Sequence, residues 1–166
     1  MSKLLKKFTY GYYIMTALKR ADKLKTREKD YIAAGTINWI SQVSFSPTII
    51  SVAVGQKSDL NETIDYSGQF TVHLLSENNK EYVSKFGSKS IIENGKINGV
   101  AFNKQNDQVI LPDTLGYVTC KVVESLTMGD HRVYFGEVIN EEIHKDKKAL
   151  CTMQLESEYT KDKAEV

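Results

Sequence analysis

Two clusters of small hydroxyl and amide side chains flank one apolar segment of this chain, residues 48–54. The upstream cluster consists of Thr36, Asn38, Ser41, Gln42, Ser44 and Ser46. The downstream cluster consists of Gln56, Lys57, Ser58, Asn61 and Thr63. Such side chains hydrogen-bond to the polar edge of a ring or to a phosphate. Two polar turns around one strand can therefore hold the two ends of an elongated, partly anionic ligand.

The downstream cluster has the composition of a phosphate site. A phosphate is bound by backbone N–H groups at the start of a helix, by hydroxyl donors and by a cation. Residues 57–63 offer all three, because Ser58 or Asp59 is predicted to begin a helix. The alternative is that this residue only caps the helix. The carboxylates of Asp59 and Glu62 would also oppose an anion unless they point away from it.

The histidines and cysteines give weaker signals. His131 follows a tight turn and starts a strand, so it either serves a ligand or bonds its own backbone. His73 lies in an apolar strand and is expected to be a satisfied core residue, whereas His144 looks solvated. The three histidines share no metal-ligand spacing, so we expect no metal. Cys120 and Cys151 are expected to be buried and reduced.

The pattern of apolar residues predicts a mainly β chain with a few short helices. The alternation of 117–126 and 131–140 around a turn at 128–130 is the clearest hairpin. Further strands are expected at 12–18, 32–45, 48–54 (buried on both faces), 70–75, 109–111 and 149–155. Helices are expected at 3–9, from 58 or 59 to 66 with capping-box spacing from Asp59 to Glu62, and at 77–86. Residues 19–31 are expected to form a charged hairpin or loop, and residues 88–108 to be irregular.

These elements favour a small antiparallel barrel in one domain spanning residues 1–166, with a frayed tail at about 156–166. The formal net charge of +1 does not point to nucleic acid or to a membrane surface. No run approaches the roughly 20 apolar residues of a membrane span, and no signal peptide is recognisable. We therefore expect a cytoplasmic protein that binds neither nucleic acid nor membrane.

Five segments carry a resemblance to a known family. They are G-T-I-N-W-I-S-Q-V-S-F-S-P (35–47), T-I-I-S-V-A-V-G-Q-K-S (48–58), S-G-Q-F-T-V-H-L-L-S (67–76), K-F-G (85–87) and G-D-H-R-V-Y-F-G-E-V (129–138). In this order they resemble the flavin reductase-like proteins, including the flavoredoxin-like ones, which have the FMN-binding split-barrel fold, antiparallel and Greek-key-like. The likeness covers about residues 9–140.

The resemblance implies a homodimer that holds FMN near its interface, with FAD or riboflavin as alternative flavins. The ring would lie against residues 36–44, and the phosphate would be met at the turn that follows 48–54. The flavin-binding residues implied are Thr36, Asn38, Trp39, Ser41, Gln42, Ser44, Val54, Lys57, Ser58 and Thr63. His131 would lie near the ring as the catalytic residue of members that use a nicotinamide.

The ring site requires hydrogen-bonding groups along one edge and an apolar surface along the other. Polar groups are available from Thr36, Asn38, Ser41 and Ser44, and apolar ones from Trp39, Val43 and Phe45. For Trp39 the alternative is a plain core position, since a lone Trp in a strand is usually core.

Three functions follow from this resemblance and from the residues. The first is an FMN-dependent oxidoreductase that takes electrons from NAD(P)H as co-substrate and passes them to a flavin or a downstream acceptor. The second is an FMN electron carrier with a redox protein as partner and no nicotinamide site. The third is a barrel that binds another phosphorylated planar ligand, such as a pyridoxal derivative. Two departures from the family leave both the reductant and the acceptor open: Pro47-Thr48 in place of Pro-Pro, and the charged segment 19–31.

Overall fold

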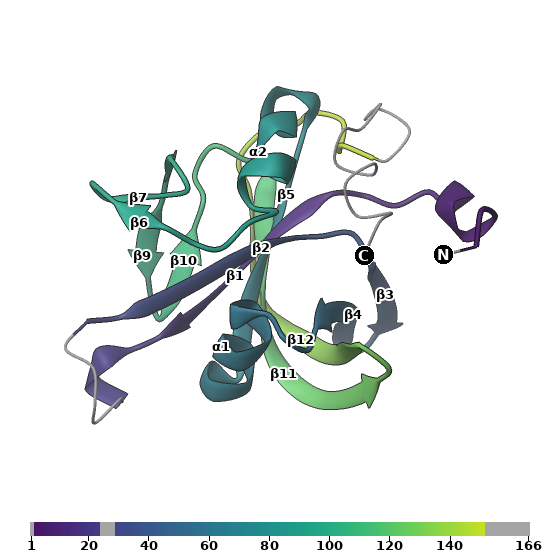
Figure 1. Cartoon of the computed structure of the whole chain (residues 1–166), viewed down its shortest axis with the longest axis horizontal. Helices are drawn as coiled ribbons and strands as arrows, with labels where there is room; N and C mark the ends of the chain where they lie inside the picture. The colour runs from purple at the N-terminus through teal and green to yellow at the C-terminus, as the bar shows by residue number, and fades with distance from the viewer. Residues whose placement is uncertain (1, 24–28, 152–166) are drawn as a thin grey trace.

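One seven-stranded antiparallel sheet organises the structure, a computed structural model that describes residues 2–23 and 29–151. The strand order is β2-β1-β5-β11-β12-β4-β3, and Figure 1 shows how β11 and β12 curve away from the long β1–β2 pair. The strands are β1 (Tyr13–Lys19), β2 (Tyr31–Ile37), β3 (Ile40–Phe45), β4 (Thr48–Gly55), β5 (Gln69–Leu74), β11 (Gly116–Met128) and β12 (His131–Ile143). The predicted mainly antiparallel β fold with a few short helices is confirmed.

Helix α1 (Asp59–Ser67) begins where the sequence predicted. Its N-cap is Ser58, whose hydroxyl oxygen accepts a hydrogen bond from the N–H of Asn61 at 3.1 Å. The helix ends at Gly68, which has a φ of 67° and donates its N–H to the carbonyl of Ile64 at 2.8 Å. The predicted capping box from Asp59 to Glu62 is wrong, because the cap lies one residue earlier.

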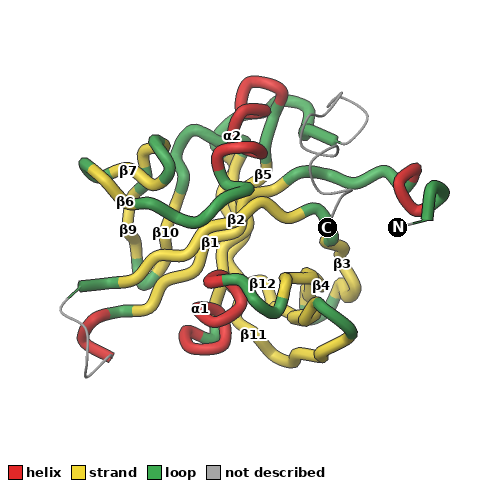
Figure 2. The backbone as a smooth tube through the Cα atoms, in the orientation of Figure 1, coloured by secondary structure: helices red, strands yellow, loops and turns green. Residues whose placement is uncertain are grey.

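Helix α2 (Lys80–Lys85) follows a 3-10 turn, η3 (Glu77–Asn79), so the helix predicted at 77–86 is present with a tighter first turn. Ser76 and Asn79 form a capping box at its start. The helix expected at 3–9 is only a 3-10 turn, η1 (Leu5–Lys7), and a third such turn is η2 (Ala21–Lys23). Figure 2 shows α1 and α2 at opposite ends of the strand layer.

The segment 88–108 is not irregular, and that prediction is wrong. It contains β6 (Ile92–Glu93), β7 (Lys96–Ile97), β8 (Val100–Ala101) and β9 (Asn103–Gln105), and it continues into β10 (Gln108–Ile110). The turns between these strands use residues with positive φ: Asn94-Gly95, Asn98-Gly99 and Asn106-Asp107. Asn-Gly pairs adopt this conformation readily and are a strong hairpin signal.

The structure also describes β4, part of the strand expected at 149–155 and the hairpin around residues 19–31. Strand β4 is fully buried on one face only, because Ile50, Val52 and Val54 alternate with half-buried neighbours. Of the strand expected at 149–155, the structure describes only residues 149–151, which form one β-bridge, between Cys151 and Gly11; Thr152 and later residues, including the tail at 156–166, lie outside the described residues. The hairpin around 19–31 is confirmed by the antiparallel pairing of β1 with β2, and its residues 24–28 also lie outside.

Two apolar cores lie on the two faces of β1. Met15 and Ala17 of β1 belong to the core that also includes Leu60 and Ile64 of α1 and buried residues of β4. Ile14 and Leu18 belong to a second core beneath α2. Helix α1 is thereby fixed on the sheet with its N-terminus at the end of β4. Within residues 2–23 and 29–151, no helix is long and apolar enough to cross a membrane.

Candidate active site

The two polar clusters meet at the end of β4. In the sheet Gly55 is paired with His131, the first residue of β12. The N–H of Gln56 donates to the carbonyl of Asp130 at 3.0 Å, and that of Ala53 donates to the carbonyl of Trp39 at 3.0 Å. The β2–β3 junction, the turn before α1 and the β11–β12 turn therefore form one continuous region.

Trp39 and His131 form an aromatic pair in this region. Their ring centroids are 4.9 Å apart with an interplanar angle of 48°. The Trp39 side chain is not a core residue, since 41% of its surface is exposed. The imidazole Nδ1 of His131 lies 2.6 Å from Oδ1 of Asp130, so its partner is a side chain and not its own backbone. This hydrogen bond lowers the pKa of Asp130. The pair offers an accessible aromatic surface beside a hydrogen-bonding nitrogen.

The hydroxyl and amide groups of the upstream cluster are placed differently from one another. Ser41 and Gln42 lie exposed on β3, where Ser41 Oγ donates to the carbonyl of Gln42 at 3.2 Å and Gln42 Nε2 to that of Ser44 at 3.1 Å. Asn38 is half-buried at the β2–β3 junction. Thr36 is already engaged, because its hydroxyl donates to the carbonyl of Val83 at 2.8 Å. Thr36 thus joins β2 to α2 in this structure.

The first turn of α1 keeps donors available. Ser58 uses its hydroxyl to cap Asn61 and to donate to the carbonyl of Gly55 at 2.8 Å. In the described structure the N–H groups of Asp59 and Leu60 have no acceptor, and the exposed Lys57 ammonium has no ion-pair partner. Two amides and one cation are therefore available to an anion here, even though Ser58 is also a cap.

Two of the expected flavin contacts do not fit this geometry. Thr63 is fully buried, and its hydroxyl donates to the carbonyl of Asp59 at 2.7 Å, as is common for a threonine inside a helix. Val54 is also buried, with 3% of its surface exposed, because it points into the core from β4. Neither side chain can reach a ligand at the surface.

The carboxylates at the start of α1 point toward the sheet. The Tyr31 hydroxyl donates to Oδ2 of Asp59 at 2.7 Å, and the Lys19 ammonium lies 2.5 Å from Oε1 of Glu62. Both carboxylates therefore have a partner on the sheet, although the side chain of Glu62 remains 74% exposed. Sequence reasoning missed Lys19 and Tyr31. The signal in the sequence was a lysine that directly continues the apolar run of 12–18, and in the structure Lys19 is only 6% exposed.

Tyr134 is a third residue that sequence reasoning missed. Its hydroxyl lies 2.8 Å from Oδ1 of Asp65 and 2.7 Å from Oδ1 of Asn61, and Arg132 also pairs with Asp65. Burial, followed by the hydrogen bond to Asp65, raises the pKa of Tyr134 to about 12. The phenol stays neutral and fixes α1 against β12.

The other two histidines and Cys120 lie outside this region. His73 is a satisfied core residue as predicted: Nδ1 lies 3.0 Å from the carbonyl of Ile14, and Nε2 accepts the N–H of Leu111 at 3.1 Å. Burial lowers its pKa to about 4. The prediction for His144 is wrong, since only 15% of its side chain is exposed and its ring packs edge-on against Tyr117 at 5.6 Å. Cys120 is buried as predicted.

No metal site was expected, and none of the predicted residues assembles one. Among residues 2–23 and 29–151, no three His, Cys, Asp or Glu side chains are close enough together to hold a metal ion. The half-buried Cys151 is the other free cysteine.

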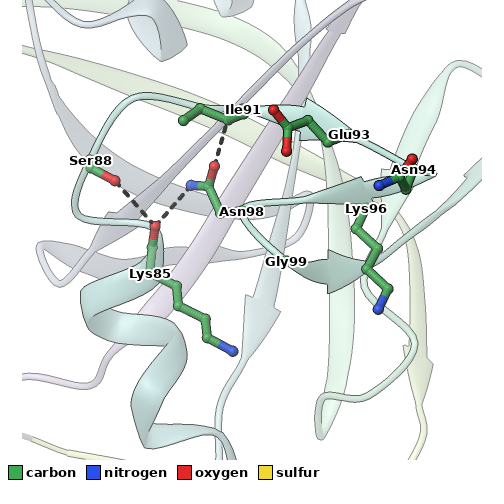
Figure 3. Close-up of a pocket in the computed structure, with 8 residues that line it drawn as sticks. All are labelled: Lys85, Ser88, Ile91, Glu93, Asn94, Lys96, Asn98 and Gly99. Carbon is green, nitrogen blue, oxygen red and sulfur yellow. Dashed lines mark hydrogen bonds between the residues drawn. The ribbon is translucent and has the colours of Figure 1, made fainter.

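A separate surface depression of about 440 Å³ lies at the end of α2 (Figure 3). Two of its polar side chains, Asn98 and Ser88, serve the local fold: Asn98 donates to the carbonyl of Lys85 at 2.8 Å and accepts the N–H of Ile91 at 2.7 Å. Ser88 also reaches the Lys85 carbonyl, at 3.4 Å. The depression contains none of the residues expected to bind flavin, so we do not place the active site there.

Comparison with known proteins identifies the family. Residues 5–160 match the Flavin reductase like domain. A ferric-chelate reductase (NAD(P)H) from Archaeoglobus fulgidus is 27% identical over 148 residues, which cover 87% of this chain and 82% of that protein. Diflavin flavoproteins from Nostoc and Synechocystis also match, but the aligned part spans only 22–24% of their length.

Solved structures share the fold at low sequence identity. The styrene monooxygenase flavin reductase from Pseudomonas putida superposes with a TM-score of 0.73 at 19% identity, covering 90% of this chain and 89% of that one. An NADH:FAD oxidoreductase from Streptomyces globisporus, solved with NAD and FAD fragments, gives a TM-score of 0.74 at 16% identity, covering 90% and 84%. Since the family match spans nearly the whole chain, this protein belongs to the Flavin reductase like domain family.

Proposed function

We propose that this chain is an NAD(P)H-dependent flavin oxidoreductase that binds FMN at the end of β4. The observation that carries the proposal is the juxtaposition described above, in which the Trp39–His131 pair lies beside the Lys57–Ser58 turn. The family supports a flavin, and relatives named as a ferric-chelate reductase (NAD(P)H) and as an NADH:FAD oxidoreductase support the nicotinamide.

The residues present fit the phosphate of a flavin. The unengaged N–H groups of Asp59 and Leu60, together with the Lys57 ammonium, supply two neutral donors and one charged donor. The exposed Ser41 and Gln42 of β3 can turn their polar groups to the pyrimidine edge of a ring, and Trp39 can cover its apolar part. We place Asn38 and Ser44 in the same ring site.

The chain contributes positioning more than chemistry of its own. When bound, the flavin supplies a site that accepts a hydride from a reduced nicotinamide and delivers electrons onward. The Nδ1 atom of His131 lies 2.6 Å from Oδ1 of Asp130, so in this proposal its other ring nitrogen serves the bound ring. Trp39 and His131 together exclude water from one side of the ring and orient it. In this proposal His131 is the catalytic residue that touches the reacting rings.

The test is an anaerobic titration of the FMN-loaded protein with NADH and then with NADPH. A reductase loses its flavin absorbance near ~450 nm on mixing with at least one of them. A flavin that resists both would leave the electron carrier as the function. A protein that takes up no FMN at all would contradict both and would favour another phosphorylated planar ligand.

Four further properties expected from the sequence are part of this proposal. They are the closure of the sheet as a split barrel, one domain over the whole chain, a homodimer with flavin near the interface, and a cytoplasmic location. The exposed side chains of Trp39, Phe45 and Met128 near the proposed site support the dimer, because a ring bound there would stay open to water in a monomer. Monooxygenase components among the relatives' names support a downstream acceptor.

A further inference from the structure

Helix α1 carries three acidic residues, Asp59, Glu62 and Asp65, and no basic one. Acidic side chains are favourable at a helix start but repel an anion that binds there. In this structure each of the three has a partner from the sheet. Asp65 is paired with Arg132 of β12, and the other two are held by β1 and β2.

Lys19 is the least ordinary of these partners, because only 7% of its side chain is exposed. Its ammonium lies 2.5 Å from Oε1 of Glu62 and 5.7 Å from the ring centroids of both Tyr31 and Tyr66. A buried lysine is rare unless it is paired. Two aromatic faces and one carboxylate stabilise the charge here. Lys19 thus keeps Glu62 directed toward β1.

Tyr31 holds the carboxylate of Asp59 by a hydrogen bond. Its hydroxyl donates to Oδ2 of Asp59 at 2.7 Å, so the first carboxylate of the helix is directed toward β2. Two of the three carboxylates of α1 thus have a cation as partner, Lys19 for Glu62 and Arg132 for Asp65, whereas the partner of Asp59 is the neutral hydroxyl of Tyr31. Without Lys19 the surroundings of the first turn carry an excess negative charge.

We propose that Lys19 and Tyr31 are positioning residues that give this protein its preference for phosphorylated flavins over riboflavin. They do so by holding the carboxylates of Glu62 and Asp59 away from the Lys57–Ser58 turn. The inference rests on the proposed function, because it assumes that the flavin phosphate lies at that turn. Lys19 itself touches neither phosphate nor ring in this proposal.

The test compares the dissociation constants of FMN and riboflavin, since only FMN carries the phosphate. Lys19→Met keeps the length of the buried side chain and removes its charge, which releases Glu62. The unpaired charge of Glu62 then lies about one helical turn from a phosphate dianion. In a high dielectric it should raise the dissociation constant of FMN by about three- to tenfold and leave that of riboflavin unchanged. Tyr31→Phe should act in the same direction through Asp59.

The double variant Lys19→Met/Glu62→Gln separates charge from packing. If Lys19 acts through Glu62, removing both charges restores the wild-type FMN-to-riboflavin ratio. A lysine that merely supports the fold would leave the double variant as weak as the single one, and both flavins would be affected equally. That result would overturn the inference. If Lys19→Met does not fold, Tyr31→Phe and Glu62→Gln are tested instead. An unchanged FMN-to-riboflavin ratio in Tyr31→Phe would then contradict the inference.

Lys57→Ala distinguishes failure of this inference from failure of the proposed site. If wild-type protein binds FMN and riboflavin equally, and Lys57→Ala changes nothing, the phosphate does not lie at this turn and the site itself is wrong. If Lys57→Ala lowers the FMN preference but Lys19→Met leaves it unchanged, the site stands and the role of Lys19 is refuted.

Discussion

Substitutions at Ser58 separate its structural role from its role toward a ligand. The Ser58 oxygen accepts the N–H of Asn61 at 3.1 Å, so it satisfies one of the free amides at the helix start. Alanine cannot do so, and loss of an N-cap costs about 1 kcal/mol. For a chain of this size that lowers Tm by roughly 2–4 °C. Aspartate caps helices as well as serine does, so Ser58→Asp should keep the Tm of the flavin-free protein near that of wild type.

For FMN binding we expect the reverse order, so that Ser58→Asp weakens binding more than Ser58→Ala does. Aspartate places a carboxylate against the proposed phosphate, beside the N–H groups of Asp59 and Leu60 that would bind it. We expect FMN binding to weaken by at least about 1–3 kcal/mol, comparable to losing a charged hydrogen bond. Alanine adds no charge and should weaken FMN less. Riboflavin should bind both variants as it binds wild type.

The assays are thermal unfolding of the flavin-free protein and flavin titration followed by fluorescence. An Asp variant that is as stable as wild type but loses its preference for FMN is the predicted outcome. If Ser58→Asp retains FMN as wild type does, the phosphate is not at this turn. If it loses as much stability as Ser58→Ala, the capping argument is wrong.

Three further predictions concern the core and the ring site. Gly136→Ala should lower the free energy of unfolding by about 1–3 kcal/mol, because the added Cβ would lie 2.5 Å from Cζ of Phe70; chemical denaturation measures it, and an unchanged midpoint would contradict the packing. The pKa of His73 is lowered from 6.5 to about 4, so the neutral imidazole contributes roughly 3 kcal/mol to the free energy of unfolding above pH 6.5. This contribution is lost as the pH falls toward 4. The pH–stability profile of His73→Gln should lack this loss. Trp39 is the single tryptophan and contacts His131, so FMN should quench most of the tryptophan fluorescence; undiminished emission from the FMN-loaded protein would place the ring elsewhere.

The hairpin of β11 and β12 was predictable because its signals are local. Val118 and Cys120 alternate with polar neighbours, and Gly129 supplies the positive φ of 61° that the turn requires. The start and end of α1 were predictable for the same reason, from Ser58 and Gly68. The short hairpins of 88–108 carry an equally local signal in Asn94-Gly95 and Asn98-Gly99, so they too were predictable from the sequence.

The parts of the site that could not be predicted depend on long-range contacts. Nothing near Lys19 in the chain indicates that Glu62 will neutralise it 43 residues later. The contact of Trp39 with His131 requires β3 and β12 to flank β4, which is known only once the strand order is known. Thr63 has the right residue type for a phosphate ligand, but its place in the helix turns its hydroxyl back to Asp59. Composition suggested the ligand class, and the fold decided which side chains are available.

A crystal structure of the protein grown with excess FMN tests the central claim most directly. We predict the phosphate within hydrogen-bonding distance of the N–H groups of Asp59 and Leu60, with the Lys57 ammonium nearby. The ring should then lie against β3 and beside Trp39 and His131. FMN bound elsewhere, or a turn at Ser58 that stays closed by its own side chains in such crystals, would contradict the account.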